Sequence, residues 1–222
     1  MNGPAGGLGV LGGTFDPVHL GHLQAALRAR EALGLEEVRL IPAARPPHRA
    51  RPRTADHHRL AMVQAAVADI EGLAADGREL SRPGPSYTFD TLRELRGESP
   101  SRPLFLILGA DAFRGLASWH RWQELAELAH LAVVNRPGTD RDELPAALAA
   151  WVAKHQIRPA RPGAPAGGLC FLDIQPLPIS ASDIRLRLSR GDSVADLLPP
   201  AVLAYIRSHH LYQRQADGSA ET

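Results

Sequence analysis

The chain has 222 residues, 44% of them hydrophobic and 22% charged, with a formal net charge of +1 at pH 7. This length suits one α/β domain with a sizeable core, and the near-neutral charge argues against binding nucleic acid through bulk positive charge. The single cysteine, Cys170, excludes an internal disulfide and fits a reducing compartment.

Hydropathy gives no sign of a membrane segment. No apolar run approaches the roughly 20 residues that a spanning helix needs, and residues 1–5 lack the basic start and long apolar region of a signal peptide. We therefore expect a cytoplasmic protein with no membrane partner.

The first predicted elements are a strand, a turn of small residues and a helix. The apolar run Leu8–Leu11 predicts a buried strand, and Leu23–Leu33 predicts a helix that Gly34 caps. The turn between them contains two glycines, Gly12 and Gly13. Such a turn suits phosphate, because glycine lets the backbone approach a ligand and the helix start offers free N–H groups.

Two histidines, His19 and His22, lie three residues apart at this helix start and therefore share a face. Their imidazoles can donate hydrogen bonds to phosphate oxygens whose charge grows in a transition state. Surface residues that merely help to start the helix are the alternative. Half of a zinc site is less favoured, because no cysteine lies near. The G-x-G-x-x-G spelling of residues 7–12 overlaps the strand, so we do not interpret it as a dinucleotide fingerprint.

The whole stretch reads Gly-Gly-Thr-Phe-Asp-Pro-Val-His-Leu-Gly-His over residues 12–22. It resembles the signature of the nucleotidyltransferase superfamily that carries an H-x-G-H motif. The sequence of this stretch is most similar to that of bacterial nicotinate-nucleotide adenylyltransferases.

A second strand is predicted over Glu37–Pro42, followed by an arginine-rich loop over residues 43–53. The loop is either solvated and flexible or a cationic lid over a polyphosphate. Its Pro-Pro-His resembles the family, with Arg49 in place of the usual lysine, so His48 or Arg49 could contact phosphate. Thr54 is predicted to cap a helix over 55–69, with two surface histidines in its first turn.

The next predicted helix starts after a turn-rich segment, with Ser86 as its cap. Residues 86–92 resemble the family segment that borders the mononucleotide pocket. The resemblance implies that main-chain N–H groups near Tyr87 and Thr88 bind the nicotinate carboxylate. An ordinary helix cap is the alternative.

The continuous apolar run Leu104–Leu108 predicts a central parallel strand buried on both faces. Gly109 and Asp111 follow at its carboxyl end, where open α/β sheets bind ligands, so Asp111 suits a ribose hydroxyl or a metal. Of the two tryptophans at helical spacing, Trp122 is predicted to be core. Trp119 is the candidate stacking platform for a pyridine ring, with backbone donors near His120.

The remaining chain is predicted to add a strand over 130–134, a helix over 142–154, a flexible linker over 158–168 and a last strand over 169–174. Residues 179–185 read as a capped helix start, with Ser180 or Ser182 as the cap. They match the family motif Ile-Ser-x-Ser/Thr-x-Ile-Arg, which implies that the hydroxyl and Arg185 hold phosphate oxygens. A closing helix at 199–207 and a frayed tail at 213–222 complete the prediction.

Alternating strands and helices predict a doubly wound, mostly parallel sheet, a Rossmann-like nucleotidyltransferase fold with a small C-terminal helical part. We expect one domain over 1–222: a core over about 8–190, a helical part over 191–212 and the tail.

The resemblance implies transfer of the adenylyl group of ATP to nicotinate mononucleotide, with Mg²⁺ accompanying ATP and no nucleic acid partner. The catalytic residues would be His19, His22 and Arg185, with no metal ligand from the protein. The predicted ATP site comprises Gly12, Gly13, Thr14, Phe15, His19, His22, Arg49, Gly109, Asp111, Ser180, Ser182 and Arg185. The predicted acceptor site comprises Tyr87, Thr88, Trp119 and His120.

Two alternatives stay open. A sister adenylyltransferase or cytidylyltransferase would keep the first motif but use another phosphate acceptor, such as phosphopantetheine. A non-catalytic nucleotide-binding module is the different class. The oligomeric state and the strictness of acid over amide preference do not follow from the sequence.

Overall fold

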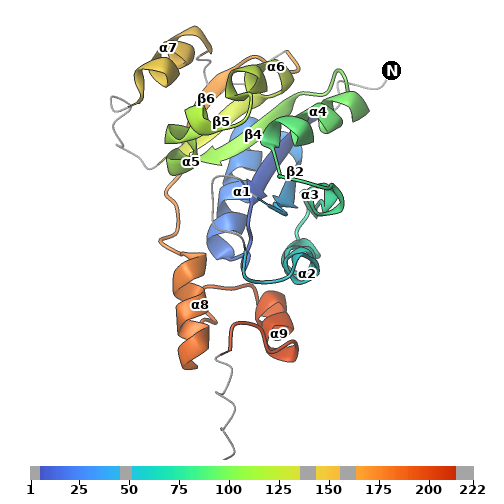
Figure 1. The fold of residues 1–222 in the computed structure, drawn as a ribbon, viewed down its shortest axis with the longest axis vertical. Helices are drawn as coiled ribbons and strands as arrows, with labels where there is room; N and C mark the ends of the chain where they lie inside the picture. Colours follow the sequence, from blue (N-terminus) through green and yellow to red (C-terminus); the bar gives the residue numbers. More distant parts are fainter. Residues whose placement is uncertain (1–5, 46–51, 136–143, 156–163, 214–222) are drawn as a thin grey trace, which may run out of the picture.

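The computed structural model describes residues 6–45, 52–135, 144–155 and 164–213, so the predictions for His48 and Arg49 lie outside the described residues. Six parallel strands form one sheet in the order β3-β2-β1-β4-β5-β6 (Figure 1). This confirms the predicted doubly wound fold. The strands are β1 (Gly7–Gly13), β2 (Leu35–Pro42), β3 (Leu73–Ala75), β4 (Leu104–Gly109), β5 (His130–Asn135) and β6 (Leu169–Asp173).

The centre of the sheet is the pair β1 and β4, whose register runs from Leu8↔Leu104 to Leu11↔Ile107. Strand order reverses here, because β2 and β3 lie on one side of β1 and β4, β5 and β6 on the other. Open α/β sheets bind ligands in the crevice at the carboxyl ends of such a strand pair. The two strands end at Gly13 and Gly109.

Both faces of the sheet are covered, and β4 shows the alternation. Leu106 and its face pack with α4 (Thr88–Glu98), α5 (Ala110–Arg114), α6 (Leu125–Leu128) and α7 (Ala146–His155). Ile107 and the opposite face pack with α1 (Leu20–Leu33), α2 (Asp56–Val67), α8 (Ala181–Arg190) and α9 (Pro200–Ser208). Figure 1 shows α8 and α9 at the end of the molecule opposite α6 and α7. No described helix has the length and apolarity that a membrane span requires.

Two predicted caps are confirmed. Gly34 ends α1 in the left-handed conformation, with φ of 61° and its N–H bonded back to the last turn. Ser180, one of the two residues predicted as the cap, is the N-cap of α8, and its Oγ accepts a hydrogen bond from the Asp183 N–H at 3.2 Å. Helix α1 begins at Leu20, earlier than the predicted Leu23, so His22 lies inside its first turn.

Two other predicted caps are wrong. Ala55, not Thr54, precedes α2, and the Thr54 side chain instead helps to lower the pKa of Asp16. Tyr87, not Ser86, precedes α4. The Ser86 hydroxyl serves a distant segment of chain, because its Oγ accepts from the Ala44 N–H at 2.9 Å.

The tryptophan segment is not one helix. It forms two short 3₁₀ turns, η1 (Leu116–Ser118) and η2 (Trp122–Glu124), and Arg121 between them has φ of 52°. Trp119 and Trp122 are both half-buried against the same core cluster. Their burial therefore does not distinguish Trp122, the predicted core residue, from Trp119, the predicted stacking platform.

Only part of the predicted linker over 158–168 is described. Within it, the Pro165 carbonyl accepts a hydrogen bond from the Leu104 N–H at 3.1 Å, so this part lies against the start of β4. A short helix, α3 (Arg78–Ser81), follows β3 and completes the described elements.

Candidate active site

The turn between β1 and α1 places both motif histidines. His19 has extended backbone and occupies the N-cap of α1, while His22 lies in the first turn. Gly21 makes room for this arrangement, because a Cβ at Gly21 would lie 3.1 Å from His19 Nδ1. The glycine of the motif therefore lets the His19 ring lie against the helix start.

The two imidazole rings stack, with centroids 3.6 Å apart and planes 24° apart. The Phe15 ring meets His22 edge-on at 5.0 Å. The His19 backbone N–H donates to His22 Nδ1 at 3.2 Å. A neutral ring that accepts at Nδ1 carries its proton on Nε2, so His22 is set as a hydrogen-bond donor at Nε2.

His19 differs from His22 in burial. It is 6% exposed, and its Nδ1 has no partner within the described part of the chain. Burial lowers the pKa of His19 to about 4. The ring is therefore neutral at pH 7 and acts through hydrogen bonding rather than positive charge.

Arg185 comes from α8 and reaches the same turn. Its Nη1 donates to the Asp16 carbonyl at 2.7 Å, and its Nη2 donates to Ser182 Oγ at 3.1 Å. The side chain is half-buried, so two anchors fix a guanidinium beside the turn. The structure thus brings Phe15, His19, His22, Ser182 and Arg185 together around the β1–α1 turn.

Asp16 contacts residues from several segments around this turn, and sequence reasoning did not assign it a role. Its Oδ2 accepts from the Arg53 N–H at 3.1 Å, and its Oδ1 accepts from the Tyr212 hydroxyl at 2.7 Å. Burial alone would raise the pKa of Asp16. Hydrogen bonds from Thr54, Tyr212 and Arg53, with the nearby Arg185 charge, hold it below its usual value.

Arg59 is a second residue that sequence reasoning missed. It is fully buried, and its Nη1 donates to the Thr14 carbonyl at 2.7 Å while Nη2 pairs with Asp56 Oδ1 at 2.6 Å. A signal existed, because Arg59 precedes Val63 by four residues on the apolar face of α2. A charged residue at a core position indicates a buried polar partner.

The carboxyl ends of β1 and β4 leave backbone accessible. A Cβ added at Gly12 or at Gly109 would meet no atom within 4 Å. Asp111 lies just beyond Gly109 with an exposed side chain that pairs with Arg114. Across the described ranges, no group of three His, Cys, Asp or Glu side chains could hold a metal ion.

Two of the predicted acceptor residues, Tyr87 and His120, lie together, beside Phe89 at the start of α4. The Tyr87 ring stacks on His120, with centroids 4.3 Å apart, and Arg121 lies 3.8 Å over the Phe89 ring. Thr88 is the first residue of α4, where N–H groups have no partner within the helix. Stacking surface and backbone donors therefore occur together, in the combination that an aromatic carboxylate needs.

The chain matches a family model described as cytidylyltransferase-like over residues 10–187, and it belongs to that family. Proteins from Pseudomonas putida strain W619 and Pseudomonas syringae pv. tomato are 51% and 49% identical to it over 210 and 214 residues. These matches cover 93% and 96% of this chain and 94% and 96% of the relatives. Both relatives are described as probable nicotinate-nucleotide adenylyltransferases, and with them the chain belongs to the nicotinate-nucleotide adenylyltransferases.

Solved structures show the same fold. Nicotinic acid mononucleotide adenylyltransferase from Plasmodium falciparum, complexed with NaAD, superposes with a TM-score of 0.70 at 18% identity. The match covers 93% of this chain and 97% of the other. The same enzyme complexed with APC gives a TM-score of 0.70 at 19% identity.

Proposed function

We propose that the chain transfers the adenylyl group of ATP to nicotinate mononucleotide, giving nicotinate adenine dinucleotide and pyrophosphate. The observation that carries this proposal is the cluster around the β1–α1 turn. There a donor imidazole, a neutral buried imidazole and an anchored guanidinium surround a helix start. The curated relatives carry the name of this activity.

The reaction needs no side-chain nucleophile, because the attacking phosphate is already anionic. An oxygen of the mononucleotide phosphate forms a bond to the α-phosphorus of ATP, and the bond from that phosphorus to the β-phosphate bridging oxygen breaks. Pyrophosphate leaves with the electron pair. Catalysis is then placement of the two phosphates and neutralisation of the growing negative charge.

The residues divide that work. His22 would donate from Nε2 to a phosphate oxygen, and Arg185 would bridge oxygens with its planar fork. His19 would contribute a neutral imidazole, because its burial disfavours a positive charge. Thr14 and Phe15 would contact ATP mainly through the backbone, as the resemblance to the family implies.

Mg²⁺ belongs to this proposal as a companion of ATP. The described residues offer no three-ligand protein cage, and Mg²⁺ commonly binds substrate phosphates with few protein ligands. When bound, it would neutralise phosphate charge.

A cytoplasmic location also stays a prediction from the sequence.

The predicted acceptor site should favour nicotinate mononucleotide, a carboxylate, over nicotinamide mononucleotide, an amide. Backbone N–H groups at the start of α4 suit a carboxylate, whereas an amide would present its own N–H₂ to them. Leaving one such donor unpaired costs about 1–3 kcal/mol, so we expect at least about a tenfold preference for nicotinate over nicotinamide mononucleotide in kcat/KM.

The test is pyrophosphate release from ATP with a panel of acceptors: nicotinate mononucleotide, nicotinamide mononucleotide, phosphopantetheine and a buffer blank. Turnover that is fastest with nicotinate mononucleotide supports the proposal. Preference for phosphopantetheine would indicate a sister enzyme, and no release with any acceptor would indicate a binding module.

A further inference from the structure

The Ser86 hydroxyl lies at a junction between two segments far apart in the sequence. Its Oγ accepts from the backbone N–H groups of Ala44 at 2.9 Å and Arg45 at 3.2 Å. The Ser86 N–H in turn donates to the Arg45 carbonyl at 3.0 Å. These hydrogen bonds tie Ser86, and with it the start of α4, to the segment that follows β2.

Glu79 interacts with the same hydroxyl. A serine oxygen has two lone pairs and one hydrogen, and both lone pairs of Ser86 are occupied by N–H donors, so its hydrogen is left for another acceptor. Burial raises the pKa of the Glu79 carboxyl, and the hydroxyls of Thr91 and Ser86 oppose that rise. Glu79 itself is 7% exposed.

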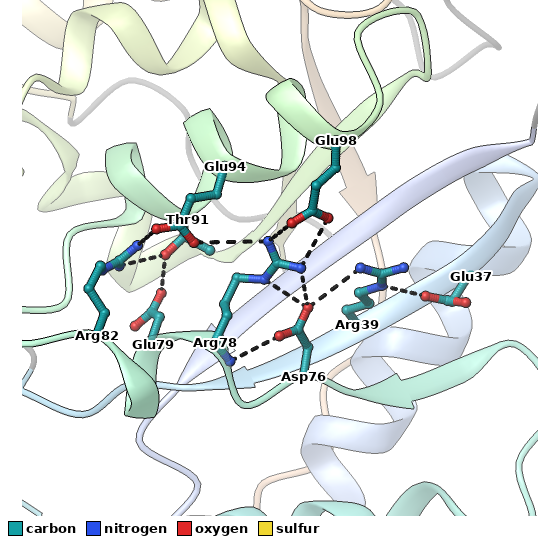
Figure 2. A network of polar contacts seen from close by, with 9 residues as sticks. All are labelled: Glu37, Arg39, Asp76, Arg78, Glu79, Arg82, Thr91, Glu94 and Glu98. Carbon is teal, nitrogen blue, oxygen red and sulfur yellow. Dashed lines mark hydrogen bonds and ion pairs between the residues drawn. The ribbon is translucent and has the colours of Figure 1, made fainter.

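Glu79 also belongs to a network of polar contacts with Thr91 and Arg82, which Figure 2 shows. Thr91 Oγ1 donates to Glu79 Oε1 at 2.7 Å, and Arg82 Nη2 donates to that same Thr91 oxygen at 3.0 Å. Thr91 is on α4, so Glu79 contacts the first turns of α4 through Thr91. The hydroxyls of Thr91 and Ser86 thus both act on the buried Glu79 carboxyl.

The junction also connects to the phosphate turn. The Ala43 N–H donates to the Gly13 carbonyl at 2.8 Å, directly beside the residues that Ser86 binds. A short series of buried and partly buried contacts thus runs from the end of β1 through residues 43–45 to Ser86, two residues before α4 begins. The ends of this series are the predicted ATP turn and the predicted acceptor site.

We propose that Ser86 and Glu79 are positioning residues that hold the acceptor site at a set distance from the phosphate turn. The proposal rests on the proposed function, in which the two substrates must meet in line. Small displacements between two reacting groups lower rates strongly, so a buried tether between the two binding regions favours transfer.

The test compares Glu79→Gln and Ser86→Ala with Glu98→Gln. The glutamine N–H₂ would confront Ser86 or Thr91 in place of a carboxylate oxygen, so one contact must break. Glu98→Gln is the matched control, because Glu98 belongs to the same network (Figure 2) but pairs with Arg78 at its exposed end. Steady-state kinetics would be measured for ATP and for nicotinate mononucleotide separately, together with melting temperatures.

We expect both test variants to raise KM for nicotinate mononucleotide about tenfold while KM for ATP changes less than about twofold. Glu98→Gln should leave both values near those of the wild type. An unchanged acceptor KM in Ser86→Ala would overturn the proposal, as would an equal rise in both KM values, which indicates general loosening. A wild type that does not use nicotinate mononucleotide refutes the proposed function instead, and the same kinetic split is then measured with the acceptor that it uses.

Discussion

At the residue scale, His19 and His22 show how similar side chains receive different properties. They stack on each other, but only His19 is almost fully buried. A backbone hydrogen bond sets the His22 tautomer, and burial sets the charge state of His19. The motif in the sequence predicts the pair, whereas this division of roles depends on the surrounding packing.

His22→Ala should lower kcat about 10²–10³-fold and change KM for ATP much less, because it removes a donor that meets charge developing in the transition state. His57→Ala is the matched control, since His57 is an exposed histidine on α2. The measurement is steady-state kinetics of the wild type, His22→Ala and His57→Ala. A His22→Ala variant that keeps near-normal turnover would contradict the assignment.

Stability should depend on pH through His19. Its folded pKa of about 4 lies below the ordinary histidine value of 6.5, so between these two pH values the unfolded chain binds a proton that the folded chain does not. Its contribution to stability is present above about pH 6.5 and is lost as pH falls toward 4. At about 1.36 kcal/mol per pKa unit, the loss is about 3 kcal/mol.

Urea unfolding at several pH values between 7 and 4 measures this contribution. His19→Asn should show a shallower decline than the wild type, because asparagine takes up no proton. His130, also buried with a lowered pKa, contributes in the same direction in both proteins and cancels in the comparison. Parallel declines in the two proteins would show that His19 is not the linked group.

At the element scale, most strands and helices follow from periodicity, because their apolar faces pack locally against one sheet. The two wrong cap predictions came from polar residues whose partners are distant. Ser86 and Thr54 read as helix caps, but Ser86 bonds a segment 42 positions earlier and Thr54 helps to lower the pKa of Asp16. A local pattern offers a cap partner within three residues and gives no information about a competing partner across the fold.

Arg59 allows a prediction at the same scale, because it ties α2 to the β1–α1 turn. Arg59→Met should leave the Thr14 carbonyl without its donor and raise KM for ATP about tenfold, since losing such a contact costs about 1–3 kcal/mol. KM for the acceptor should stay nearly constant. Arg28→Met is the control, since Arg28 forms an exposed pair with Glu31 on α1. A lowered melting temperature with unchanged KM for ATP would assign Arg59 a purely structural role.

At the scale of the whole molecule, the sheet order places the ends of β1 and β4 side by side, and sequence reasoning anticipated that arrangement. It did not anticipate how the C-terminal segment returns to the same place. Tyr212 follows α9, yet its hydroxyl donates to Asp16 across 196 positions of sequence. Burial raises the pKa of Tyr212, which keeps the hydroxyl protonated as a donor.

Two truncations and one substitution test whether this contact closes the fold. A chain ending at Gln213 should match the full chain in stability and activity, because it retains Tyr212. A chain ending at Leu211 should have a free energy of unfolding lower by about 2 kcal/mol, since hydrogen bonds to charged groups contribute about 1.5–3 kcal/mol to stability. That corresponds to a fall of roughly 4–8 °C in Tm for a chain of this size. Tyr212→Phe removes only the hydroxyl and should reproduce most of the fall. If Tyr212→Phe melts with the full chain while the shorter truncation does not, packing of the ring rather than the bond to Asp16 holds the segment.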